Sequence, residues 1–99
     1  MRYQKGEVYY QLTYPEIRML YPNIQSFVFV GKNLSPEDEN DIWYFQFSDS
    51  YARYGSILDS DRGDRKVIGL AKDELEQMLD LEGLTSKLRA AAVRRKQAK

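Results

Sequence analysis

Apolar and polar residues alternate over residues 7–14, and this alternation predicts the first strand of the protein. Val8, Tyr10 and Leu12 fall on one face of such a strand, whereas the opposite face is more polar and carries Tyr9. A period of two is typical of a strand that buries one face and leaves the other in water. We therefore expect Tyr9 to be exposed.

Residues 24–32 and 41–48 are the strongest strand predictions, because aromatic and β-branched residues dominate both segments. Trp43, Phe45 and Phe47 share one face of the second segment. Neither segment has a plainly polar face, which is typical of central strands that are covered on both sides. The polar connection between them is too long for a tight hairpin.

Two segments beside these strands have weaker signals. Residues 48–55 predict a helix of about two turns, with Ser48 or Asp49 as its N-cap and Gly55 following its last turn. Residues 15–20 lie between two prolines and fit either one helical turn or an ordered loop.

Two short strands are predicted next, at residues 56–58 and 65–70. The segment between them, residues 59–64, consists mainly of Asp, Ser and Gly, which tolerate the backbone conformations of tight turns. With the three strands above, these segments predict a sheet of four to five strands.

The last third of the chain is predicted to be helical. Asp73 and Glu76 have the spacing of a capping box, and apolar residues follow at helical spacing. Gly83 is expected to break or bend this helix. A second helical segment then starts at Thr85 or Ser86, or the apolar stripe simply continues past the glycine.

These elements predict a single α+β domain over residues 1–93, in which a small, curled, mostly antiparallel sheet is covered by one or two C-terminal helices. The apolar residues 75–79 are expected to pack on the strand of Trp43, so that Trp43 is buried between sheet and helix. The apolar stripe fades after Val93. Residues 94–99 are therefore expected to form a frayed basic tail.

Composition removes most catalytic chemistry. The chain contains no cysteine and no histidine, which excludes thiolate metal sites, thiol catalysis and the most common general base. Its glycines are scattered and form no phosphate-binding loop. The acidic residues 37–41 are the one candidate for a hard cation, and we interpret them as a solvated connection. We expect no enzyme activity, no cofactor and no metal.

Charge is distributed unevenly along the chain. Residues 1–86 contain nine Lys and Arg against fifteen Asp and Glu, whereas residues 87–99 contain six basic residues and no acidic one. The macrodipole of a C-terminal helix would account for only two or three of these cations. The others either neutralise the acidic part of the same chain or bind a partner.

The leading hypothesis is a non-catalytic small protein that acts through protein–protein interaction, as an accessory, inhibitor or immunity-type factor, or through self-association. A nucleic-acid-associated accessory protein that uses the basic C-terminal segment is the alternative, which the net charge of −6 over residues 1–86 opposes. An enzyme that works through carboxylates is the third hypothesis. The predicted partner-binding residues are Tyr9, Tyr44, Arg89, Arg94, Arg95 and Lys96.

The expected cellular location follows from the absence of targeting and membrane-spanning signals in the sequence. The N-terminal residues lack the apolar run of a signal peptide, and no segment approaches the ~18 apolar residues that a membrane span needs. We expect a cytoplasmic protein without membrane contacts.

Overall fold

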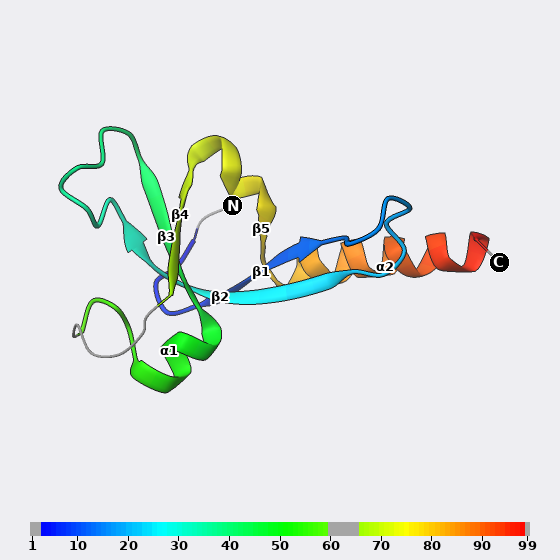
Figure 1. The fold of residues 1–99 in the computed structure, drawn as a ribbon, viewed down its shortest axis with the longest axis horizontal. Helices are drawn as coiled ribbons and strands as arrows, with labels where there is room; N and C mark the ends of the chain where they lie inside the picture. The colour runs from blue at the N-terminus through cyan, green and yellow to red at the C-terminus, as the bar shows by residue number, and fades with distance from the viewer. Residues whose placement is uncertain (1–2, 60–65, 99) are drawn as a thin grey trace.

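The computed structural model describes residues 3–59 and 66–98 and shows a curled five-stranded antiparallel sheet in the order β4-β3-β2-β1-β5 (Figure 1). This confirms the predicted α+β fold with helices beside a small antiparallel sheet. The strands are β1 (Val8–Thr13), β2 (Asn23–Lys32), β3 (Ile42–Phe47), β4 (Val67–Ala71) and β5 (Met78–Leu79). The helices are α1 (Ser48–Tyr54), the 3-10 helix η1 (Lys72–Gln77) and α2 (Leu81–Gln97).

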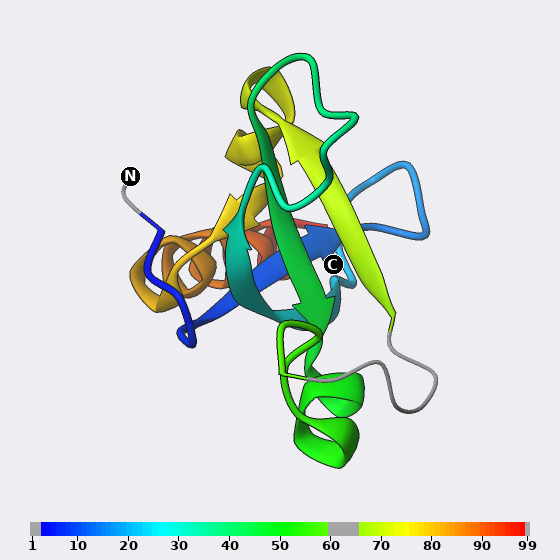
Figure 2. The same ribbon diagram turned by 90° about the vertical axis from the view of Figure 1, so that its left-hand side faces the viewer.

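The curl of the sheet begins in β2. The register between β2 and β3 shifts between Phe29 and Gly31, which marks a bulge that bends the strand. Gly31 has a φ of 149°, and a Cβ atom at this position would lie 2.9 Å from a side-chain carbon of Leu34. Only glycine fits both the conformation and the space. Figure 2 shows β3 and β4 crossing in front of the β1–β2 hairpin as a result of the curl.

The aromatic core lies on the face of the sheet that carries Tyr9, and the prediction that Tyr9 is exposed is wrong. Only 5% of Tyr9 is accessible, because its pairing with Phe27 places it on the same face as the core phenylalanines. Its hydroxyl accepts a hydrogen bond from the backbone N–H of Gln4 at 2.8 Å. The core cluster consists of Tyr9, Phe27, Phe29, Phe45, Leu70 and Met78.

The C-terminal helix covers a different part of the sheet from the one predicted. It packs on β1 and β5 rather than on β3, because β5 pairs with β1 and leads directly into α2. Trp43 is therefore only half-buried, and the Lys32 ammonium lies 4.7 Å from its ring centroid. Leu75 does pack against the core cluster, but it does so from η1.

The predicted starts of the helices also need correction. Asp73 lies within η1, and α2 begins after Asp80, whose carboxylate accepts a hydrogen bond from the backbone N–H of Gly83 at 2.8 Å. Gly83 therefore belongs to the first turn of α2 and does not break a helix. No side chain caps α1, so Ser48 and Asp49 are not N-caps.

Two other predictions concern loops. Residues 56–58 form a turn and not a strand, and Leu58 is exposed there. Residues 15–20 form an ordered loop and not a helix. Most of the predicted turn at residues 59–64 lies outside the described residues.

Candidate functional site

The β1–β2 hairpin and α2 extend side by side away from the rest of the sheet, which gives the molecule its long axis of 50 Å against 29 and 22 Å (Figure 1). Residues 14–22, which connect the two strands, lie beside the end of α2. We call residues 14–22 together with residues 88–97 of α2 the arm. Residues 94–97, which were expected to fray, are helical and form the last turn of α2.

Two arginines at the end of α2 hold the connecting loop of the arm. Arg94 donates hydrogen bonds to the Met19 carbonyl at 2.8 Å and to the Tyr14 hydroxyl at 2.9 Å, and it also lies over the Tyr14 ring. Arg95 donates to the Leu20 carbonyl at 2.7 Å. Two of the basic residues predicted to face a partner, Arg94 and Arg95, thus have a structural role in their own chain.

The carboxylate of Glu16, a residue of the same loop, also holds the loop in shape. Glu16 accepts hydrogen bonds from the backbone N–H groups of Leu20 and Tyr21. Met19 has a φ of 57°, a left-handed conformation that is uncommon outside glycine, and the surrounding contacts hold it. The loop therefore has one defined shape.

Apolar side chains at the tip of this loop point into water. Ile17 is 98% exposed and Tyr21 is 64% exposed. Met19 and Val93 in the arm are exposed as well, so four of the ten large exposed hydrophobic residues in the described chain lie here. Apolar side chains gathered on a fixed loop indicate a contact surface for another molecule.

Cations surround these apolar residues. The arm contains Arg18, Arg89, Arg94, Arg95 and Lys96, with Glu16 as its one acid, for a net charge of +4. A groove of about 470 Å³ runs between the loop and α2, and no acidic residue lines it. Its cationic lining is Arg18, Arg95 and Lys96, and its apolar lining includes Tyr21 and Ala92.

The six predicted partner-binding residues do not form one site. Arg94, Arg95 and Lys96 lie together in the arm, and Arg89 is exposed nearer the middle of α2. Tyr9 is in the core, and Tyr44 is half-buried on β3.

The predicted partner-binding residues do not include Ile17, Arg18 and Tyr21 of the loop. A signal for them exists, because the segment between Pro15 and Pro22 is dense in apolar residues although prolines mark it as a loop.

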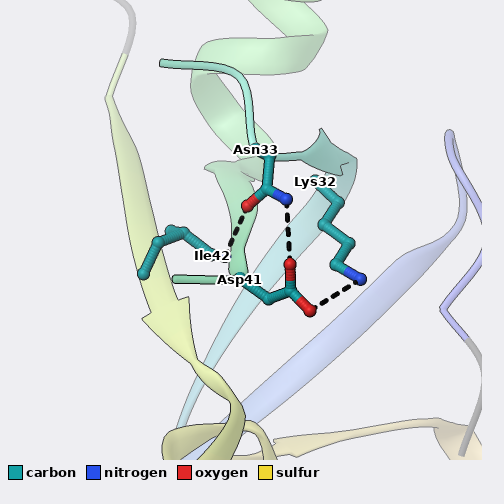
Figure 3. A network of polar contacts seen from close by, with 4 residues as sticks. All are labelled: Lys32, Asn33, Asp41 and Ile42. Carbon is teal, nitrogen blue, oxygen red and sulfur yellow. Dashed lines mark hydrogen bonds and ion pairs between the residues drawn. The ribbon is translucent and has the colours of Figure 1, made fainter. Parts of the chain in front are cut away.

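A second loop that hydrogen bonds hold in place, residues 33–41, lies at the end of the molecule opposite the arm (Figure 1). We call it the acidic loop. The Asn33 amide donates to the Asp41 carboxylate at 3.0 Å, and the Ile42 backbone N–H donates to the Asn33 side-chain oxygen at 2.8 Å (Figure 3). Lys32 forms an ion pair with Asp41 at 3.1 Å. These contacts, first the hydrogen bond from Asn33 and then that from Lys32, lower the pKa of Asp41.

Tyr44 fixes the middle of the acidic loop. Its hydroxyl lies 2.9 and 3.0 Å from the two carboxylate oxygens of Asp38, and this hydrogen bond raises the pKa of Tyr44. Glu37, Glu39 and Asp41 remain exposed. Among residues 3–59 and 66–98, no three acidic side chains converge on a position that could hold a metal ion.

The most buried polar side chain has structural partners. Gln46 is completely buried, donates to the Ser50 hydroxyl and the Gly55 carbonyl, and accepts from the backbone N–H of Ile57. All of its hydrogen-bonding groups are thereby satisfied by α1 and the turn that follows it.

Comparison with known proteins gives no further lead: no protein-family model, no curated protein and no solved structure matches this chain. None of the helices in the described residues combines the length and the apolar character that a membrane crossing requires.

Proposed function

We propose that this protein is a small, non-catalytic cytoplasmic binding protein of the accessory, inhibitor or immunity type, and that its arm binds an acidic protein surface. The observation that carries this proposal is the exposed apolar tip at Ile17, held on a fixed loop among five cations. A fixed loop loses little conformational entropy when it binds, so its apolar contacts contribute fully to affinity.

The chemistry of the arm defines the partner. Ile17 and Tyr21 favour an apolar recess, because burying such side chains is the largest favourable term in protein association. The surrounding net charge of +4 favours acidic groups at the rim of that recess. Arg94 and Arg95 already donate hydrogen bonds to the loop, which leaves Arg18, Arg89 and Lys96 as the cations of the arm without a hydrogen bond or ion pair among residues 3–59 and 66–98.

Nucleic acid is the competing partner, because five cations near an exposed tyrosine also suit a phosphate backbone. If nucleic acid binds, log affinity should fall with log salt at a slope of about −4, roughly 0.9 for each neutralised phosphate. The fully exposed isoleucine favours protein, since an aliphatic side chain gains nothing from phosphate.

A photocrosslinking experiment tests the proposal. A photoreactive amino acid is placed at position 17 and, as a control, at Leu58, which is also exposed and apolar but lies outside the arm. We expect a protein crosslink from position 17 alone, and the Arg18→Glu/Lys96→Glu variant should lose it.

Equal crosslinks from both positions, or none from position 17, would contradict the proposal. A gel shift with duplex and single-stranded oligonucleotides supplies the second readout. A tight, arm-dependent complex with either oligonucleotide would replace the protein partner with nucleic acid.

A further inference from the structure

The two charged ends of the molecule cannot neutralise each other within one copy. The arm and the acidic loop lie at opposite ends of the long axis (Figure 1). Across residues 3–59 and 66–98, the single ion pair is Lys32 with Asp41, and both residues belong to the acidic end. Interactions between exposed charges are largely screened beyond ~8 Å at physiological salt. Within one copy, each end is therefore left to water and counterions and is available to a partner.

The two ends match each other in charge and in rigidity. The acidic loop itself carries Glu37, Asp38, Glu39 and Asp41 for a net charge of −4, or −3 with Lys32, which is paired with Asp41, against +4 on the arm. The hydrogen bonds of Asn33 (Figure 3) fix its shape, together with that of Tyr44, as the arginines fix the arm.

The two surfaces are also complementary in the types of side chain that they expose. The groove of the arm combines Arg18, Arg95 and Lys96 with the exposed ring of Tyr21. The acidic loop presents the exposed carboxylates of Glu37 and Glu39 just after the exposed Pro36. A proline ring can pack on an aromatic ring while the neighbouring carboxylates meet the cations of the groove, so the two surfaces are complementary in charge and in apolar contact.

We propose that the arm of one copy binds the acidic loop of a second copy, with the exposed carboxylates of the loop seated in the cationic groove beside Tyr21. This inference rests on the proposed function and names its partner as another molecule of the same chain. The two surfaces differ, so the contact is heterologous and each copy keeps one free arm and one free acidic loop. Association therefore continues to short chains or closed rings.

Sedimentation of the unmodified 99-residue chain tests this contact. At about 25 mM NaCl, where charges are weakly screened, the weight-average mass should rise with protein concentration above the monomer mass of 11.6 kDa. At about 500 mM NaCl it should return to the monomer mass, because the Debye length falls to about half its physiological value. A mass that stays monomeric at low salt and high protein concentration overturns the inference.

Charge reversal at either end identifies the surfaces. Arg18→Glu/Lys96→Glu and Glu37→Lys/Glu39→Lys should each be monomeric at low salt. An equimolar mixture of the two variants should associate again, because each supplies the surface that the other lacks. A mixture that stays monomeric, or a single variant that still associates, contradicts the inference.

The matched controls carry the same changes elsewhere. Lys5→Glu/Arg53→Glu and Glu7→Lys/Asp73→Lys alter exposed residues outside both surfaces and should associate like the unmodified chain. Loss of association in these controls would mean that net charge, and not the two surfaces, is responsible. The outcome is separable from that of the proposed function: a monomeric chain whose position 17 still crosslinks to another protein would refute self-association alone.

Discussion

We call the part of the described chain outside the arm the body. The body and the arm are stabilised by different kinds of interaction. The core cluster around Phe27 and Phe45 buries aromatic rings in edge-to-face contact, and burial of apolar area dominates its free energy. The arm loop buries little besides Leu20 and is held by hydrogen bonds from Arg94, Arg95 and Glu16.

This difference separates stability from recognition. The body buries the aromatic rings of its core cluster, so those rings are not accessible to a partner. The arm buries few apolar side chains and leaves Ile17 and Tyr21 exposed to water. Substitutions in the body should therefore unfold the protein, and substitutions in the arm should leave it folded.

The largest effect is expected for Phe45→Ala, because Phe45 is completely buried at the centre of the core cluster. Truncating a buried phenylalanine costs about 3–5 kcal/mol, a large share of a typical domain's stability. Urea unfolding followed by circular dichroism measures it. Ile17→Ala is the matched apolar truncation in the arm and should change the free energy of unfolding by less than ~0.5 kcal/mol. Similar losses for both variants would refute the comparison.

The next effect concerns the buried polar network of the body. Gln46→Met keeps the volume of the side chain but leaves the Ile57 N–H and the Gly55 carbonyl without their partner. An unsatisfied buried group costs about 1–3 kcal/mol, so we expect a loss of about 2 kcal/mol or more in urea unfolding. Gln97→Met on the exposed end of α2 is the control and should be neutral.

A smaller effect is expected when the arm loop loses its clamp. Arg94→Met removes the hydrogen bonds to Met19 and Tyr14, and we expect a loss of about 1 kcal/mol. Hydrogen exchange at the backbone amide of Leu20 should become faster, because the loop opens more often. Arg89→Met on the same helix should leave this exchange unchanged. An unchanged rate in Arg94→Met would show that the arginine does not hold the loop.

The smallest effect on stability is expected at Asp41. Its pKa is lowered, first by the hydrogen bond from Asn33, so its contribution is present above the ordinary pKa of 3.8 and is lost as pH falls through the lower, folded-state pKa. Asp41 is exposed, so this change should loosen the acidic loop without unfolding the body. An NMR titration of the carboxylate should show the lowered pKa, and Asn33→Ala should return it toward its ordinary value. Identical titration curves for the two proteins would refute the network.

Local patterns predicted much of the body. The aromatic and β-branched density of β2 and β3 identified both central strands, because such residues suit a pleated, covered surface whatever its partners are. The face shared by Trp43, Phe45 and Phe47 was also predicted. Tyr9 was misassigned because alternation shows that a strand has two faces but does not show which face meets the core.

The candidate site was predicted only in part. The run Arg94-Arg95-Lys96 identified the basic end of the chain, but the apolar loop beside it is some 75 residues away in sequence. Two short signals that are weak alone become one surface only when the fold brings them together. Periodicity could not reveal this, because the loop has none.

The sequence by itself determined the α+β class, the central strands, the missing thiol and imidazole chemistry and the segregation of charge along the chain. Each of these follows from composition or from local backbone preference, which neighbours in sequence decide. Only the tertiary structure decided that α2 packs on β1 and β5, that its arginines hold the loop around Met19, and that Ile17 is left in water. These features depend on the order of the strands and on contacts between distant residues, where many pairings satisfy the same local pattern and packing selects one of them.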